Sequence, residues 1–187
     1  MAVLGLANRI DIRDTDLNDP DEPVRAQNPL GKIPALVMED GTTYFDSRVI
    51  LEVLDHLADG GRIVPAEPKA RFAALRLHAL CDGILDAGVL LVYESRYRPP
   101  DKQVQVWIDR QREKVARALA VLEAAPPPFD GAAPFVPDVG QIALACALGY
   151  QDLRFGGDWR ASYPKLVAWL DRFAALVPSF DQTKVQP

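Results

Sequence analysis

The chain has 187 residues, of which 49% are hydrophobic and 25% are charged, values typical of a globular protein with a packed core. Its length allows one large domain or two small ones. The formal net charge of −5 comes without a block of basic residues, so we expect neither a nucleic-acid partner nor binding to an anionic membrane surface.

The N-terminal segment is apolar and short, without the basic start or small-residue cleavage pattern of a signal peptide. No apolar run approaches the roughly 20 residues that span a bilayer, so we predict a cytoplasmic protein. Residues 1–8 are predicted to be the end of a helix with Asn8 as its C-terminal cap, and residues 9–13 alternate in polarity as a strand does. A polar loop over 14–22 and a short helical turn over 23–27 follow.

Two short apolar runs, 33–38 and 42–45, are joined by Glu-Asp-Gly at 39–41. An Asp-Gly pair between two β-prone runs is a strong signal for a β-hairpin. Directly after the hairpin, Asp46 and Ser47 are both good helix N-caps. The apolar residues that follow them have helical spacing and predict a helix; they are Val49, Ile50, Val53, Leu54, Leu57 and Ala58.

Pro34 interrupts the first of these runs, and proline is tolerated in a strand only at its first residue, an edge or a bulge. A cis bond between Ile33 and Pro34 is one way to accommodate it. If Ile33 presents its backbone outward, an extended peptide can pair with it. Ser47 and the first N–H groups of the next helix can then hold a carboxylate. Together these features describe a site for a small peptide.

Residues 59–68 are rich in Gly and Pro and predict a linker between two domains. Beyond the linker, the apolar spacing predicts helices over 69–98 and 104–122, and three consecutive prolines at 126–128 end the second of them. The second half of the chain is therefore predicted to be helical.

Asp138 and Gln141 have the spacing of a capping box at the start of the next helix. Residues 142–148 are apolar nearly all round, which predicts the buried central helix of this domain. Residues 165–176 are amphipathic and predict the last helix, and residues 181–187 are expected to be unstructured.

Cys81 and Cys146 lie far apart in apolar helical stretches, without a CxxC motif. We expect both to be buried, unreactive thiols in a reducing cytosol. His56 and His78 lack the spacing of metal ligands, so we predict no metal site.

The segments NPLGKIP, DG and FDSRVI, in this order, resemble the glutathione-binding half of cytosolic glutathione transferases. The later stretches ALCDGILDAG and QIALACALGYQDLRF resemble the helical domain of bacterial members. The resemblance implies an α/β plus all-α protein, in which a truncated thioredoxin-like domain over 1–58 and a linker over 59–68 precede an all-helical domain over 69–187.

The resemblance also implies a set of contacts to glutathione. Asp46 would hold the γ-glutamyl ammonium, and the Ser47 hydroxyl and N–H would hold its carboxylate. Lys32 would reach the glycyl end, Ile33 would pair through its backbone with the cysteinyl unit, and Pro34 would be the cis proline that makes this geometry possible. Without a ligand, Ser47 is simply a helix cap and Lys32 a solvated surface charge.

In the family the first strand lies between the second and third strands of the sheet, whereas this sequence begins inside the first helix. The family's thiol-activating Ser, Cys or Tyr therefore has no counterpart here, and no catalytic residue is assigned. A strand at 9–13 without an interior neighbour leaves its backbone unpaired. Three explanations remain open: a true start upstream or a truncation, which we favour; a natural inactive fragment; or another segment or subunit in the vacant position. We expect little or no transferase activity from the chain as it stands.

The resemblance implies a cytoplasmic homodimer that, when its N-terminal segment is complete, joins the glutathione thiolate to small hydrophobic electrophiles in detoxification, with glutathione as co-substrate and no other cofactor. The alternative is a non-catalytic module of the same fold that binds a ligand or a protein. Asp82 and Asp86 are spaced as paired carboxylates, but we favour polar contacts between helices or between subunits. Tyr93, Arg96 and Tyr97 are candidates for a substrate pocket or for surface packing. The tryptophans predict core or interface positions.

Overall fold

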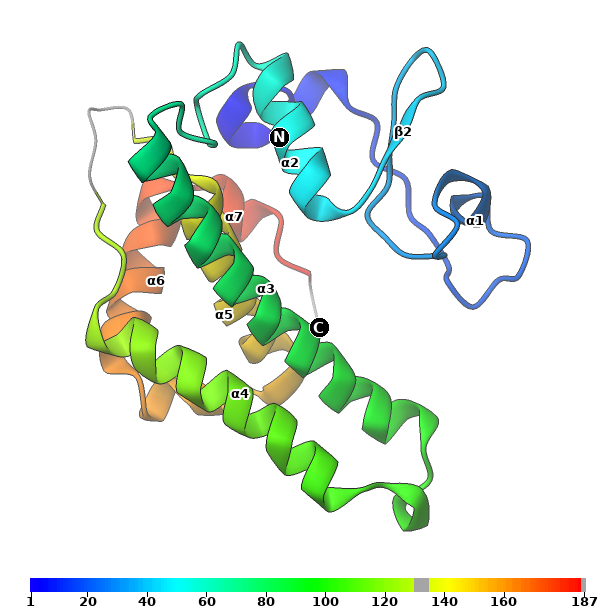
Figure 1. Ribbon diagram of the computed structural model, residues 1–187, viewed down its shortest axis with the longest axis vertical. Helices are drawn as coiled ribbons and strands as arrows, with labels where there is room; N and C mark the ends of the chain where they lie inside the picture. The colour runs from blue at the N-terminus through cyan, green and yellow to red at the C-terminus, as the bar shows by residue number, and fades with distance from the viewer. Residues whose placement is uncertain (130–134, 186–187) are drawn as a thin grey trace. The chain divides into compact units, whose positions relative to one another are not determined.

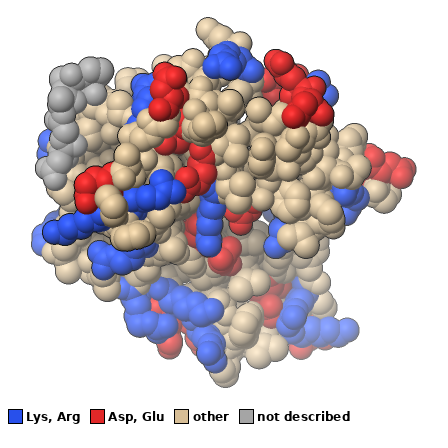
Figure 2. Space-filling view, turned by 45° about the horizontal axis from the view of Figure 1, so that its top comes forward, with Lys and Arg blue, Asp and Glu red and all other residues tan. Residues whose placement is uncertain are grey.

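The computed structural model describes residues 1–129 and 135–185, which form two compact units, 1–66 and 67–187 (Figure 1). Each unit is described by itself. Within the described residues, no helix is long and apolar enough to cross a membrane. On the face shown in Figure 2, acidic and basic side chains are interspersed, as expected from a sequence without a basic block.

The first unit contains short elements and one longer helix. Their bounds are 3-10 turns at Ala2–Leu4 and Ala7–Arg9, helix α1 at Val24–Gln27, strand β1 at Leu36–Val37, strand β2 at Thr43–Tyr44 and helix α2 at Ser47–Leu57 (Figure 1). Its core is formed by apolar side chains from the N-terminal turns, α1, α2 and the segment after α2: Leu4, Leu6, Val24, Ile50, Leu54, Ala58, Ile63 and Val64.

The beginning of the chain differs from the prediction. Residues 1–8 form 3-10 turns rather than an α-helical end, and Asn8 lies inside the second turn instead of capping a helix. Ile10 has extended backbone angles, φ −126° and ψ 121°, but residues 10–15 join no strand of the described sheet. The predicted strand at 9–13 is therefore wrong, because an extended segment becomes a strand only when a neighbour pairs with it.

The predicted hairpin is confirmed but is shorter than the two apolar runs. Strands β1 and β2 are antiparallel, with Leu36 opposite Tyr44. Met38 N–H donates to the Thr42 carbonyl at 2.8 Å, and Gly41 has a φ of +86°, which glycine adopts without steric cost. The ladder begins two residues after Pro34, because proline has no N–H to donate.

Helix α2 ends beside a buried carboxylate. Asp55 is 4% exposed and accepts three backbone N–H groups, from Gly61 at 2.7 Å, Arg62 at 3.0 Å and Ile63 at 2.7 Å. These bonds fold the segment after the helix back onto the helix end. The Arg62 guanidinium in turn donates to the Leu4 carbonyl at 3.1 Å, which ties the first turn of the chain to this corner.

The second unit is helical, as predicted. Its elements are α3 at Pro68–Tyr97, a 3-10 turn at Pro100–Lys102, α4 at Gln105–Ala124, α5 at Val139–Phe155, a 3-10 turn at Asp158–Ala161, α6 at Pro164–Leu176 and α7 at Ser179–Gln182 (Figure 1). The prediction that residues 181–187 are unstructured is wrong at 181–182, which belong to α7. Thr183 N–H also donates to the Ser179 carbonyl, and residues 186–187 lie outside the described residues.

Helix α5 is the buried centre of this unit. The predicted capping box is present: Gln141 N–H donates to Asp138 Oδ1 at 2.9 Å, and Asp138 N–H donates to Gln141 Oε1 at 3.0 Å. Leu144 and Leu148 are fully buried. Cys146, on another side of the same helix, is exposed, so the prediction that both cysteines are buried holds for Cys81 and is wrong for Cys146. The apolar character of α5 did not reveal which side faces outward.

Candidate functional site

A buried asparagine shapes the turn that leads into the hairpin. Asn28 is 2% exposed; its Nδ2 donates to the Lys32 carbonyl at 2.8 Å, and its Oδ1 accepts from Leu30 N–H at 3.0 Å. Gly31 N–H also donates to the Asn28 carbonyl at 2.8 Å. Asn28 therefore fixes the backbone of Lys32, a role that the sequence reasoning missed although Asn-Pro is a turn signal.

The candidate residues at the entry of the hairpin are exposed. Ile33 is 55% exposed, Lys32 and Pro34 are exposed, and the Ile33–Pro34 peptide bond is cis. Neither the N–H nor the C=O of Ile33 bonds to another described residue. Both backbone groups are therefore available to an external partner.

The hairpin register relates this entry to the start of α2. With Leu36 opposite Tyr44, two further residues along each chain lead to Pro34 and Asp46. The cis Ile33–Pro34 bond and the first turn of α2 are thus brought to the same end of the hairpin, although they are separated by more than ten residues in the sequence.

Asp46, and not Ser47, caps α2. The Asp46 Oδ1 accepts from Arg48 N–H at 3.0 Å, and its carbonyl accepts from Ile50 N–H at 3.0 Å. Ser47 is the first helical residue, so its interpretation as the cap is wrong. Its half-buried hydroxyl bonds to no described residue.

The N-terminus of α2 suits a ligand that carries both signs of charge. The first N–H groups of a helix lack intrahelical partners and carry the positive end of the helix dipole, so they attract anions. The Ser47 hydroxyl adds another donor there, while the exposed Asp46 carboxylate can receive a cation through Oδ2. The arrangement fits a group with a carboxylate and an ammonium on neighbouring atoms.

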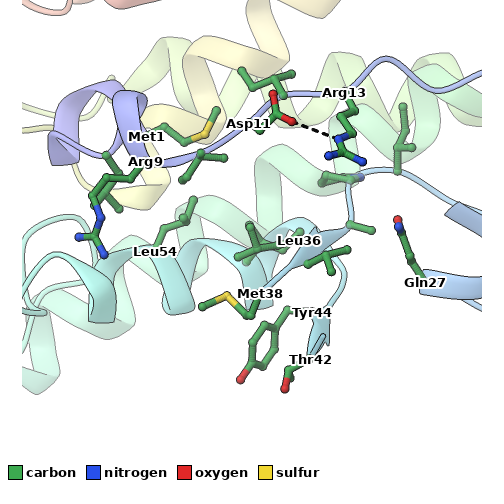
Figure 3. A pocket seen from close by; sticks show the side chains of 18 of the residues that line it. Met1, Arg9, Asp11, Arg13, Gln27, Leu36, Met38, Thr42, Tyr44 and Leu54 are labelled. Atoms are coloured by element: carbon green, nitrogen blue, oxygen red, sulfur yellow. Dashed lines mark hydrogen bonds and ion pairs between the residues drawn. The ribbon is translucent and has the colours of Figure 1, made fainter. Parts of the chain in front are cut away.

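A large cavity, about 1450 Å³, opens beside the hairpin in the same unit (Figure 3). Segment 9–15 lines one side of the cavity, and β1 and α2 line the other. Ile33 and Pro34 belong to its lining, whereas Asp46 and Ser47 do not. The candidate peptide site and the cavity are therefore neighbours that share only the cis-proline corner.

Two family models match the chain. Residues 1–57 match the glutathione S-transferase N-terminal domain, and residues 105–172 match the glutathione S-transferase C-terminal domain. The uncharacterized GST-like protein YibF of Escherichia coli K12 is 38% identical over 149 residues, covering 79% of this chain and 72% of that protein. The chain belongs to the glutathione S-transferase family.

Solved structures agree with this family assignment. A glutathione transferase family member from Pseudomonas fluorescens Pf-5, solved with bound glutathione, is 40% identical with a TM-score of 0.87, covering 99% of this chain and 92% of that chain. A glutathione S-transferase from Methylobacillus flagellatus KT, solved with glutathione bound, is 36% identical with a TM-score of 0.82, covering 95% and 90%. The fold of this transferase family member is accordingly an N-terminal thioredoxin-like domain with a small sheet and a helical C-terminal domain.

Cys81, the buried cysteine of this glutathione S-transferase family member, is expected to be a poor nucleophile. Burial, together with the neighbouring Asp82 carboxylate, raises the pKa of the Cys81 thiol to about 12. The thiol therefore stays protonated near neutral pH, and a protonated thiol is a poor nucleophile. Within the described ranges, no group of three or more His, Cys, Asp or Glu side chains is arranged to hold a metal ion.

The acidic pair on α3 does not form a catalytic dyad. Asp82 Oδ2 lies 3.5 Å from Nε2 of the buried His78, one helical turn away, while Asp86 is exposed. The contact lies within α3, so it does not test the favoured interpretation of contacts between helices or subunits, which stays a prediction.

The aromatic candidates near the end of α3 form an exposed cluster. The rings of Tyr93 and Tyr97 meet edge to face with centroids 5.2 Å apart, and both are exposed. On α5, the Arg154 guanidinium lies 5.9 Å from the Tyr150 ring centroid. Burial raises the pKa of the Tyr150 hydroxyl, while the charges of Arg154 and Arg96 oppose that rise. An aromatic surface with two cations thus lies within the helical unit.

Proposed function

We propose that this glutathione S-transferase family member binds glutathione at the end of the hairpin and joins its thiolate to small hydrophobic electrophiles. The observation that carries the proposal is the free backbone of Ile33 next to the N-terminus of α2, where the Ser47 hydroxyl bonds to no described residue. The two related bacterial proteins solved with bound glutathione support it. In this proposal the protein acts in the cytoplasm as a homodimer in detoxification.

Each charged end of glutathione has a matching group in this assignment. The Ile33 backbone pairs with the cysteinyl unit, as an added strand pairs with a sheet edge. The Ser47 hydroxyl and N–H hold the γ-glutamyl carboxylate, and Asp46 Oδ2 holds the ammonium. Lys32, whose backbone is fixed by Asn28, reaches the glycyl carboxylate. Pro34 keeps the Ile33 carbonyl turned outward.

Conjugation requires the glutathione thiol to ionise, and an unperturbed thiol has a pKa of about 8.5. The positive end of α2 favours negative charge on the bound ligand. Within the helical unit, the exposed rings of Tyr93 and Tyr97 are the candidates for contact with an apolar compound.

Calorimetric titration with glutathione tests the binding step, with thermal melts on the same samples. Lys32→Ala is expected to weaken affinity roughly tenfold, or about 1.4 kcal/mol, with no change in melting temperature, because the side chain is exposed. Lys102→Ala is the matched control, since this lysine lies in the helical unit, and it should leave the affinity unchanged.

The two residues at the start of α2 should behave differently. Ser47→Ala should weaken glutathione binding without lowering the melting temperature, because Ser47 caps nothing. Asp46→Ala should weaken binding and also cost about 1 kcal/mol of stability, since it removes the N-cap. Unchanged affinity in all three site variants would mean that the glutathione site lies elsewhere.

Turnover of a chromogenic aryl halide with glutathione tests the chemical step. Glutathione-dependent product formation supports the transferase and would contradict the expectation, from the sequence alone, of little or no activity. Glutathione binding with no turnover of any aryl halide or epoxide would instead identify a non-catalytic binding module of the same fold.

A further inference from the structure

We propose that the helical unit binds a planar aromatic carboxylate on a surface formed by side chains of α3 and α5. We call it the tyrosine–arginine surface and define it by Tyr93, Arg96, Tyr97, Tyr150 and Arg154. The inference adds a negative charge to the apolar compound considered above and assigns two arginines to hold that charge. Binding there concerns residues 67–187 alone and does not depend on the proposed glutathione site, so either site can be present without the other.

A glycine of α3 gives the ring of Tyr150 its place. A Cβ on Gly88 would lie 2.9 Å from Tyr150 Cε1, closer than real side chains allow. The ring therefore packs against the backbone of α3 where α3 and α5 lie side by side (Figure 1). Glycine is unfavourable inside a helix, and here its missing side chain is what allows the close approach. The Tyr150 ring is thus a fixed part of the surface.

Two guanidinium groups lie near this ring. The Arg154 guanidinium is 5.9 Å from the Tyr150 ring centroid. Burial raises the pKa of the Tyr150 hydroxyl, and the charges of Arg154 and Arg96 act against that rise. Because the effect of an exposed charge fades within about 10 Å at ordinary ionic strength, both charges must lie near the hydroxyl. The hydroxyl stays protonated near neutral pH and can donate a hydrogen bond to an anion beside them.

Both arginines are without an acidic partner. Arg96 and Arg154 are exposed, and neither forms an ion pair with any residue that the structure describes. Glu94 and Asp152, the acids closest to them in sequence, are each paired with another arginine. Asp86 lies nearly three helical turns before Arg96, about 15 Å along α3. Two neighbouring cations without an anion attract one, and the planar guanidinium group matches the geometry of a carboxylate.

The exposed tyrosine pair supplies the aromatic part of the surface. The rings of Tyr93 and Tyr97 meet edge to face, 44% and 62% exposed. At about 100° per residue, Arg96 lies about 60° around α3 from Tyr93 and about 80° from Gly88, on the arc between them. Arg96 therefore stands between the tyrosine pair and the ring of Tyr150.

This order of side chains selects an aromatic acid. A flat ring can cover the exposed tyrosines while its carboxylate reaches the guanidinium groups. An uncharged aromatic compound would cover the rings but leave both cations unmatched. An aliphatic acid would match the cations but leave the aromatic rings exposed to water.

The test compares 2-naphthoate with 2-naphthamide, which has the same rings and no charge, by calorimetric titration of the full chain without glutathione. We expect 2-naphthoate to bind at least tenfold more tightly. Arg96→Gln and Arg154→Gln should each weaken 2-naphthoate binding at least fivefold and leave 2-naphthamide binding unchanged, because they remove a cation and no ring. Arg76→Gln is the matched control: it removes the same charge from an exposed position of α3 and should change neither affinity.

Two further variants locate the ligand. Tyr93→Ala should weaken both compounds at least threefold, because it removes ring contact. Ser47→Ala should leave 2-naphthoate binding unchanged, because the N-terminus of α2, another candidate for a carboxylate, belongs to the first unit.

Several results would each overturn the proposal. They are equal affinity for the two compounds, no 2-naphthoate binding at millimolar concentration, unchanged affinity in both site arginine variants or in Tyr93→Ala, an equal loss in Arg76→Gln, and a loss in Ser47→Ala. Binding of 2-naphthoate with the expected variant pattern by a chain that does not bind glutathione would support the tyrosine–arginine surface and contradict only the proposed glutathione site.

Discussion

Single polar side chains fix the backbone of the first unit at the points where regular structure ends. Asn28 holds the turn before the hairpin, Asp46 caps α2, and Asp55 holds the segment after α2. Each satisfies backbone groups that would otherwise lie buried or at a helix end without partners. The first unit has only a two-stranded sheet, so these side-chain bonds stabilise backbone segments that strand pairing would stabilise in a larger sheet.

Asp55→Asn is expected to destabilise the first unit by roughly 2 kcal/mol. The amide keeps one acceptor oxygen but places an NH₂ group against a backbone N–H that now donates to a carboxylate, so at least one buried donor loses its partner. Urea denaturation measures the change. Asp14→Ala, an exposed acid of the same unit, serves as the control and should change stability by less than about 0.5 kcal/mol.

At the scale of elements, α3 and α5 approach each other at a glycine. A Cβ on Gly140 would lie 2.7 Å from the Ala74 carbonyl oxygen and 2.8 Å from Leu77 Cβ. Real side chains do not tolerate such distances, so the two helices would have to separate or shift. Gly83, on α3, has open space around the position of its Cβ.

Gly140→Ala should therefore destabilise the protein by about 1–3 kcal/mol, the cost of overpacking a core. Gly83→Ala should stabilise it by up to about 1 kcal/mol, since alanine is the better helix former and meets no neighbour. Thermal melts of both variants test the pair. A melting temperature of Gly140→Ala equal to that of the unmodified chain would show that α3 and α5 do not pack this closely.

For the whole molecule, we expect the helical unit to be the more stable one. The helices of residues 67–187 satisfy their own backbone bonds and enclose a buried α5, whereas the first unit has a two-stranded sheet and an unpaired segment. Isolated hairpins are marginal in water without further strands or a covering helix. Local stability should differ accordingly.

Hydrogen exchange of the free chain measures this difference. Amides of 142–148 should exchange only on global unfolding of the helical unit, while those of 10–14 should exchange at nearly intrinsic rates because they make no backbone bond. The α2 amides supply an internal reference within the first unit. Equal protection of 10–14 and 142–148 would contradict the expectation.

Much of the secondary structure of this protein could be predicted from its sequence, because the residue patterns that specify it are local. The Asp-Gly turn, the start of α2 after the hairpin, the capping box of Asp138 and Gln141, and the long amphipathic helices each depend on residues a few positions apart. The coupled motifs around NPLGKIP and FDSRVI are specific enough that the sequence by itself indicates the family.

Other features depended on contacts between distant residues, and only the tertiary structure decided them. Segment 9–13 has the polarity of a strand, yet it stays unpaired because no described strand lies against it. Both Asp46 and Ser47 can cap a helix, and the backbone path out of the hairpin selects Asp46. The exposure of Cys146 depends on which sides of α5 are covered by neighbouring elements. In each case the sequence determines what a residue can do, and the position of its neighbours determines which of those interactions it makes.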